Sequence, residues 1–280
     1  MNQAVDEYGV IGHPVAHSWS PFIHGLFARE TGQALVYRLY DVEPARFQPA
    51  VREFAARGGR GLNVTVPHKL AAAQLAHELT ERARLAGAVN TLCFLADHTV
   101  GDNTDGAGLV CDLTANLGLE IRDRRILIAG AGGAARGVIA PLLGLEPREL
   151  VIGARALARA EELARQFAAL GPVRASALAE LPAEPFDLVI NATSASLSLE
   201  LPAIPNETIG AHTSCYDMAY SRSDTAFVRW ARERGCARAE QGWGMLVEQA
   251  AESFCIWRGV RPETQTVRAL LNERRAPPGT

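Results

Sequence analysis

The sequence predicts an α/β protein of two domains, and three observations carry this prediction. Strand-like and helix-like stretches alternate along the first hundred residues, which indicates a mostly parallel sheet with helices on its faces. A second series of the same kind begins near residue 124 with the apolar run RRILIAG. The chain has 280 residues and 48% hydrophobic content, which is enough for the cores of two medium domains.

The elements of the first series follow from their apolar patterns. At 61–66, Leu62, Val64 and Val66 alternate with Asn63 and Thr65, as in a strand with one buried face. We expect strands at 8–12, 35–40 and 61–66, helices at 20–31, 43–57 and 67–86, and then a hairpin-like pair of strands from AVNTLCFL and TVGD.

The second series has the same rhythm. We expect strands at 124–130, 149–154, 186–193 and 213–220, and helices at 105–117, 133–144 and 156–169. From residue 242 a long helix carries an apolar stripe, and a terminal helix follows Pro262. We expect both to pack on the first domain. The first domain would therefore comprise 1–104 completed by 242–280, the second 105–241, with a cleft between them.

Composition excludes several classes of function. A net charge of −3 and 6% aromatic content give no attraction for nucleic acid, and no apolar run is long enough to span a membrane. The five cysteines are odd in number, widely spaced and without a CxxC pair, as in reduced cytosolic proteins. No signal peptide or metal-ligand spacing is visible. We therefore expect a cytoplasmic protein without a metal.

The stretch ILIAGAGGAARG predicts a Rossmann-type dinucleotide site. It places Gly130, Gly132 and Ala135 in the G-x-G-x-x-G/A pattern, between a strand and a helix. Gly130 permits the tight turn, Gly132 lets a pyrophosphate approach the backbone, and the helix N-terminus offers free N–H groups. A tight turn without a ligand is the alternative.

The next strand indicates which dinucleotide binds. NAD sites carry Asp or Glu at its end, but this strand ends in VIGARALAR without a carboxylate. Arg155 and Arg159 lie there instead, and two guanidinium groups suit the 2′-phosphate of NADP. The alternative is a pair of solvated helix arginines. The pattern favours NADP(H) as the cofactor.

Polar residues elsewhere suggest a substrate site. Ser20 before Pro21 is typical of an N-cap with proline at N1, and the helix start with the Ser18 and Ser20 hydroxyls suits a carboxylate. Taken alone, Asp105 fits an N-cap. Gln249 fits either a solvent-facing residue or a donor in a cleft.

Together these stretches resemble bacterial shikimate dehydrogenase over about residues 8–270. The matching stretches are HPVAHSWSPFIH, NVTVPHK, LAGAVNT, GDNTDG, GAGGAARG, NATS, YDMAY and GMLVEQA, in the order and spacing of the family. The family has an N-terminal substrate domain and a Rossmann-type NADP domain. The resemblance implies NADP-dependent interconversion of 3-dehydroshikimate and shikimate, in chorismate and aromatic amino-acid biosynthesis, by a monomer or homodimer.

The resemblance also implies roles for individual residues. Lys69 and Asp105 would be the catalytic pair, and Ser18 and Ser20 would bind the substrate carboxylate. The expected contacts to the substrate hydroxyls and the reacting oxygen are Thr65, Asn90 and Gln249, with Asn63 and Tyr220 nearby. On the cofactor side the resemblance implies Gly130, Ala131, Gly132, Gly133 and Ala134 for the pyrophosphate, Arg155 and Arg159 for the 2′-phosphate, Met218 and Gly242 near the nicotinamide, and Glu81 as a lesser contact.

The chain departs from the family pattern at three places. Where the family usually has an Asn-Arg-Thr clamp, this sequence has Ala154-Arg155-Ala156, so two of the family's polar contacts to the cofactor are missing. The glycines that usually follow NATS are absent from NATSASLSLELP, and Gln241 stands where the family usually has aspartate.

The expected chemistry explains why a lysine follows the strand at 61–66. Reduction of a ketone adds hydride to carbon and a proton to oxygen, and a lysine ammonium stabilises the developing alkoxide and donates that proton. Two alternatives stay open. One is an NAD-dependent quinate/shikimate dehydrogenase, which the two clamp arginines argue against but the missing Asn and Thr leave open. The other is a non-catalytic NADPH-binding sensor.

Overall fold

A computed structural model describes residues 5–193 and 200–275, and the chain divides into two units. The first unit comprises the chain up to Gly108 together with Leu246–Ala269, and the second comprises Leu109–Met245 and the chain from Leu270 onward. These divisions fall at 108 and 245, whereas we expected boundaries at 104 and 241. The last division lies inside the terminal helix α10 (Gln265–Arg275), which was expected to belong wholly to the first domain.

A sheet of six strands, ordered β2-β1-β3-β5-β6-β4, forms the centre of the first unit. Five strands run in the same direction, and β5 runs against its neighbours because β5 and β6 form the expected hairpin. The prediction of a mostly parallel sheet is confirmed. The strands are β1 (Asp6–Gly12), β2 (Leu35–Asp41), β3 (Gly61–Val64), β4 (Glu78–Leu79), β5 (Thr91–Phe94) and β6 (Thr99–Asp102).

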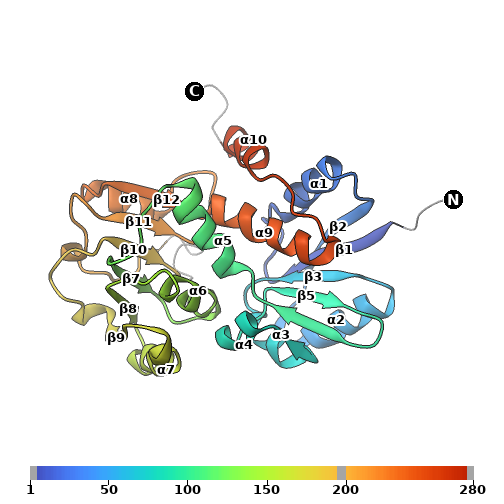
Figure 1. The fold of residues 1–280 in the computed structure, drawn as a ribbon, viewed down its shortest axis with the longest axis horizontal. Coiled ribbons are helices and arrows are strands. Elements are labelled where there is room, and N and C mark those ends of the chain that lie inside the picture. The colour runs from blue at the N-terminus through green and yellow to red at the C-terminus, as the bar shows by residue number, and fades with distance from the viewer. Residues whose placement is uncertain (1–4, 194–199, 276–280) are drawn as a thin grey trace. The chain divides into compact units, whose positions relative to one another are not determined.

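Helices cover both faces of this sheet (Figure 1). On one face, α2 (Phe47–Ala56) and α3 (Lys69–Leu75) pack on a buried apolar cluster that includes Leu62 and Leu92. On the other face lie α1 (Ser20–Glu30) and α9 (Trp243–Arg258), where rings of Phe27 and Phe254 meet edge to face. Because side chains alternate along a strand, Asn63 points to the α9 face while Leu62 points to α3.

The histidine of α1 gives stability a defined pH dependence. His24 is buried and stacks on Tyr37 at 4.2 Å between ring centroids. Burial lowers the pKa of His24 from 6.5 to about 3, so between these values the unfolded chain binds a proton that the folded chain excludes. Above pH 6.5 the burial of neutral His24 therefore costs no stability through proton binding. As the pH falls below 6.5, the free energy of unfolding decreases. At pH 4.5 the loss is roughly 2–3 kcal/mol of unfolding free energy.

Urea unfolding at pH 7 and pH 4.5 tests this expectation. His24→Phe keeps an aromatic ring against Tyr37 but cannot titrate. The unmodified protein should lose roughly 2–3 kcal/mol more than this variant between the two pH values. The same pH dependence in both proteins would contradict the assignment.

Three details of the first unit differ from the sequence prediction. The helix expected at 67–86 is divided into α3 and α4 (Glu81–Ala86), because Glu78 and Leu79 pair with β6 and the Thr80 side chain caps α4. The strand expected at 61–66 ends at Val64, and Val66 is 46% exposed. Ser20 is the first residue of α1 and its N-cap is Trp19, one residue earlier than predicted.

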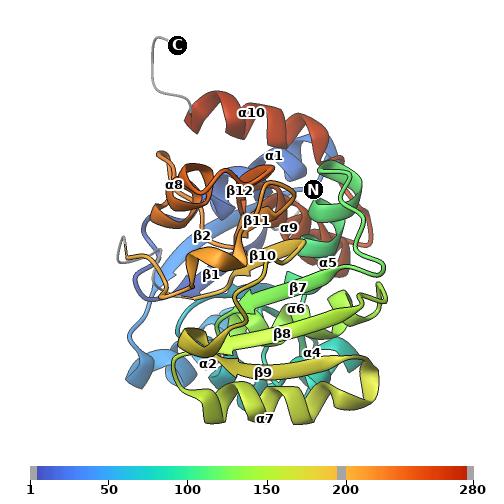
Figure 2. The ribbon, with the colours of Figure 1, turned by 90° about the vertical axis from the view of Figure 1, so that its left-hand side faces the viewer.

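The second unit contains a fully parallel sheet in the order β12-β11-β10-β7-β8-β9 (Figure 2). Counted from β7, this is the strand order of doubly wound dinucleotide-binding domains, so the fold-class prediction is confirmed. Its elements are α5 (Asp105–Cys111, shared with the first unit), β7 (Arg125–Ala129), α6 (Gly133–Leu143), β8 (Glu149–Ala154), α7 (Leu157–Phe167), β9 (Val173–Ala177), β10 (Leu188–Asn191), β11 (Ser214–Asp217), α8 (Ala226–Glu233) and β12 (Arg238–Gln241).

Several elements of this unit were missed or misjudged. The edge strands β9 and β12 were not predicted, because VRASA and RAEQ lack an apolar run. The helix α8 was not predicted either, although its apolar residues lie on one buried face. The helix expected at 105–117 changes to a π-helical turn at Asp112–Asn116. There the buried Asp112 carboxylate accepts a hydrogen bond of 2.6 Å from the Tyr216 hydroxyl.

Candidate active site

The two residues predicted to be catalytic form an ion pair in the first unit. Lys69 is the first residue of α3 and Asp105 the first residue of α5, and Lys69 Nζ lies 2.5 Å from Asp105 Oδ2. The Lys69 side chain is 13% exposed and that of Asp105 is 6% exposed. Lys69 is also the single lysine of the sequence. A largely desolvated ammonium with a fixed carboxylate is suited to donating a proton to an oxygen beside it.

Asn90 and Gln249, which the resemblance implies as substrate contacts, adjoin this pair. Asn90 Nδ2 donates to Asp105 Oδ1 at 2.9 Å and lies 3.3 Å from Gln249 Oε1. Gln249 Nε2 donates to the carbonyl of Leu246 at 2.9 Å, which leaves its second N–H for another acceptor. The structure therefore brings Lys69, Asn90, Asp105 and Gln249 into one cluster.

The acidic end of β6 is held by an arginine. Asp102 accepts hydrogen bonds from Arg82 at 2.6 and 2.8 Å and from Thr80 at 2.6 Å. Burial raises the pKa of Asp102, but the hydrogen bonds from Arg82 and Thr80 outweigh it and lower the pKa overall. Asp102 therefore stays ionised and anchors the chain three residues before Asp105.

The predicted carboxylate-binding serines lie at the start of α1. The Ser18 hydroxyl donates to Ser20 Oγ at 3.1 Å, and the backbone N–H of Ser20 donates to Ser18 Oγ at 3.3 Å. Thr65 follows β3, where its N–H donates to Ile11 and its carbonyl accepts from His68. The Thr65 hydroxyl has no hydrogen-bond partner among the described residues, so it has a donor and acceptor to offer a ligand.

Asn63 occupies a different position from the other predicted substrate contacts. Its side chain is buried, and its Oδ1 accepts from the Tyr37 hydroxyl at 2.7 Å. Its Nδ2 lies 2.9 Å from Ser253 Oγ and 3.2 Å from Thr91 Oγ1. Both ends of the Asn63 amide therefore have partners within the protein.

The predicted pyrophosphate turn lies between β7 and α6 in the second unit. Gly130 has φ +120°, and a Cβ there would stand 2.9 Å from the carbonyl oxygen of Ala192, so only glycine fits. Gly132 is the N-cap of α6, with open space where a Cβ would be, and Ala131, Gly133 and Ala134 complete the turn. The first N–H groups of an α-helix lack partners within the helix, which makes this turn suited to a phosphate.

The predicted 2′-phosphate clamp follows β8. Arg155 and Arg159 flank the start of α7, and both are exposed. Neither forms an ion pair with any carboxylate in residues 5–193 and 200–275. Two guanidinium groups without a carboxylate at this strand end fit a 2′-phosphate.

The remaining predicted residues of the second unit follow β11 and β12. The N–H of Met218 donates to the carbonyl of Asn191 at 3.0 Å, and a Cβ on Gly242 would lie 2.5 Å from the carbonyl oxygen of Met218. Gly242 is therefore required for this close approach. The Tyr220 ring lies 4.7 Å from the Trp243 ring.

The departure at Gln241 has a structural explanation. Gln241 Oε1 accepts from the N–H of Ser221 at 2.7 Å, and its Nε2 donates to the carbonyl of Ser223 at 3.2 Å. Its amide thus ties the segment that follows Tyr220 to the end of β12. An aspartate could accept the first bond but could not donate the second.

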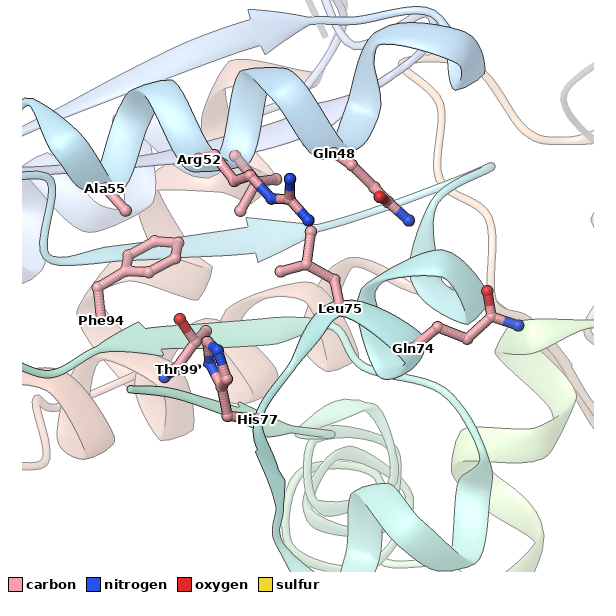
Figure 3. Close-up of a pocket in the computed structure, with 9 residues that line it drawn as sticks. Gln48, Arg52, Ala55, Gln74, Leu75, His77, Phe94 and Thr99 are labelled. Atoms are coloured by element: carbon pink, nitrogen blue, oxygen red, sulfur yellow. Dashed lines mark hydrogen bonds between the residues drawn. The ribbon is translucent and has the colours of Figure 1, made fainter. Parts of the chain in front are cut away.

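Other predictions have less support. Glu81 is exposed at the start of α4, and no hydrogen bond joins its side chain to another described residue. The glycine-poor loop after NATS lies outside the described residues from 194 to 199. The cavity of about 190 Å³ in Figure 3, lined by residues including Arg52, His77 and Phe94, lies on the α2–α3 side of the first sheet and contains none of the predicted residues.

Sequence reasoning missed the residues behind Asn90. Thr91, Thr104 and Ser253 are fully buried, and their hydroxyls join Asn63, Asn90 and Gln249 in one hydrogen-bond network. The threonines lie within the quoted stretches LAGAVNT and GDNTDG. Ser253 lies one helical turn after Gln249. This spacing places both on the same face of the helix, and it is the feature of the sequence that could have indicated Ser253.

Comparison with known proteins identifies the family. Three family models match: Shikimate dehydrogenase substrate binding domain at residues 10–92, Shikimate / quinate 5-dehydrogenase at 112–209, and Shikimate 5′-dehydrogenase C-terminal domain at 242–271. A relative from Methylococcus capsulatus, named shikimate dehydrogenase (NADP(+)), is 52% identical over 96% of this chain and 97% of its own. The chain belongs to the shikimate dehydrogenase family.

Solved structures agree with membership of the shikimate dehydrogenase family. An Ael1 enzyme from Pseudomonas putida is 46% identical, with a TM-score of 0.88 over 95% of this chain and 98% of that chain. A shikimate 5-dehydrogenase from Thermus thermophilus, solved with NADP(H) and shikimate, is 30% identical. Its TM-score is 0.85 over 97% of this chain and 100% of that chain. The family predicted from the sequence is confirmed.

No helix in residues 5–193 and 200–275 is long and apolar enough to cross a membrane. No group of three or more His, Cys, Asp or Glu side chains in the same residues could hold a metal ion.

Proposed function

We propose that this protein is an NADP-dependent shikimate dehydrogenase, which interconverts 3-dehydroshikimate and shikimate. The observation that carries the proposal is the buried pair of Lys69 and Asp105 with Asn90 and Gln249 beside it. The relatives named shikimate dehydrogenase (NADP(+)) at about half identity support it.

Lys69 acts as the acid in the direction of ketone reduction. Its ammonium has three N–H donors, of which one is directed at Asp105. Another donates to the carbonyl oxygen, stabilises the developing alkoxide and delivers the proton that completes the alcohol. In the reverse direction the neutral amine takes the alcohol proton. Asp105 orients the ammonium throughout, and its Oδ1 is held by Asn90.

Substrate recognition divides between two ends of the first unit. The Ser18 and Ser20 hydroxyls at the start of α1 bind the substrate carboxylate. The free Thr65 hydroxyl, the Asn90 amide and the second N–H of Gln249 bind the ring hydroxyls. Asn63 supports these groups from behind, and Tyr220 of the second unit is a further contact.

The residues present fit NADP(H). The turn from Gly130 to Ala134 holds the pyrophosphate on backbone N–H groups, and Arg155 with Arg159 holds the 2′-phosphate. Met218 and Gly242 adjoin the nicotinamide, and Glu81 is a lesser contact. The cofactor, when bound, supplies or accepts the hydride.

A spectrophotometric assay of NADPH formation tests this function. Shikimate with NADP+ should give turnover with kcat/KM at least about 10-fold above that with NAD+, since one charge-assisted hydrogen bond contributes about 1.5–3 kcal/mol. Turnover limited to quinate with NAD+ would favour the NAD-dependent alternative. NADPH binding without turnover of either substrate would favour a sensor.

A further inference from the structure

A buried hydroxyl lies at the centre of the network behind the candidate site. Ser253 on α9 is 0% exposed. Its Oγ lies 2.9 Å from Asn63 Nδ2, 2.9 Å from Thr91 Oγ1 and 3.2 Å from Thr104 Oγ1, and it donates to the carbonyl of Gln249 at 3.0 Å. One side chain thus joins β3, β5, the segment before α5, and α9.

The donors and acceptors around Ser253 fit a single pattern. A serine hydroxyl has one proton and two lone pairs, and in a helix it commonly donates to the carbonyl four residues earlier. With its proton on Gln249, Ser253 Oγ can accept from Asn63 and from one threonine. Tyr37 donates to Asn63 Oδ1, which fixes the amide so that its N–H groups face Ser253.

The same network reaches the groups that face the substrate. The hydroxyls of Thr91 and Thr104 lie 2.9 and 3.2 Å from Asn90 Oδ1. Thr104 Oγ1 also lies 3.4 Å from Gln249 Oε1. Asn90 Oδ1 also accepts from the backbone N–H of Thr104 at 2.8 Å, so the threonine hydroxyls and this N–H together direct the Asn90 N–H groups to Asp105.

We propose that Ser253 is a positioning residue that orients Asn90 and Gln249 for the substrate, a role that rests on the proposed function. Without the Ser253 acceptor, Asn63 and one threonine hydroxyl lose a buried partner. The threonine proton is then redirected to Asn90 Oδ1 or Gln249 Oε1, which changes the hydrogen bonds that orient these two amides. Binding of shikimate then weakens. Binding of NADP+ is unchanged, because all its proposed contacts except the exposed Glu81 lie in the second unit, and Glu81 is not part of this network.

The experiment compares two replacements of different kinds. Ser253→Ala removes the Oγ, whereas Ser253→Cys keeps a side chain of similar size that is a poor acceptor. Both variants should raise the KM for shikimate roughly 10-fold, which corresponds to the loss of one or two buried hydrogen bonds. The KM for NADP+ should stay within about 2-fold of that of the unmodified protein. The control is Thr208→Val in the second unit, where a buried hydroxyl donates only to the Pro205 carbonyl at 2.7 Å. It should leave both KM values unchanged.

The outcomes separate positioning from packing. An unchanged shikimate KM in Ser253→Cys would show that only side-chain volume matters and would overturn the proposal. A parallel rise in both KM values in Ser253→Ala would overturn it too. If Ser253→Ala does not fold, Thr91→Val removes the link to Asn90 and should raise the shikimate KM alone. No turnover of shikimate by the unmodified protein would instead refute the proposed function, and this proposal with it.

Discussion

Lys69→Ala should lower kcat for shikimate oxidation by roughly 10²–10⁴-fold, the usual contribution of one acid–base group. The reason is that the Lys69 ammonium, 2.5 Å from Asp105, is the proposed proton donor and acceptor for the substrate oxygen. No other lysine in the sequence could replace it. Steady-state assays at saturating shikimate and NADP+ give the measurement. An unchanged kcat would remove Lys69 from the mechanism.

A second variant separates chemistry from folding. Lys69→Ala leaves the Asp105 carboxylate, which is 6% exposed, without its cation, and breaking a buried pair in this way costs about 3–5 kcal/mol of stability. The double variant Lys69→Ala with Asp105→Asn removes both charges. It should regain much of the lost stability while kcat stays low. Recovery of kcat together with stability would assign the loss to misfolding.

Chemical rescue tests the role of the amine directly. Lys69→Ala leaves room for a small molecule where the lysine side chain stood. Ethylamine should raise its rate in proportion to concentration, whereas ethanol, of similar size, should not. Equal effects of the two additives would argue against proton transfer by the amine.

The parts of the fold that the sequence predicted are those with local signals. The glycine turn at 130–134 is one, because Gly130 at φ +120° packs against Ala192 and no other residue type fits. The division of the helix expected at 67–86 had no local signal. Its Ala-rich sequence suits a helix throughout, and pairing of Glu78 and Leu79 with β6 is a tertiary effect that overrides propensity.

The candidate site was predictable only through the family pattern. Lys69 and Asp105 are 36 positions apart, and each has an ordinary explanation by itself as a surface lysine or a helix cap. Thr91 and Ser253 are 162 positions apart, and no spacing rule joins two hydroxyls over that distance. Their hydrogen bond depends on α9 packing on the sheet, which periodicity indicates without giving the register.

The double variant Arg155→Ala with Arg159→Ala should weaken NADPH binding by about 10²-fold and NADH binding by less than about 3-fold. Each exposed arginine is expected to contribute about 1–1.5 kcal/mol through charge-assisted bonds to a 2′-phosphate that NADH lacks. Nicotinamide fluorescence titrations with both dinucleotides give the dissociation constants.

Arg165→Ala is the control, because Arg165 is exposed at the other end of α7. Salt should narrow the gap between NADPH and NADH in the unmodified protein, since exposed charges are screened. Equal losses for the two dinucleotides in the double variant would refute the clamp, and the NAD-dependent alternative would then be preferred.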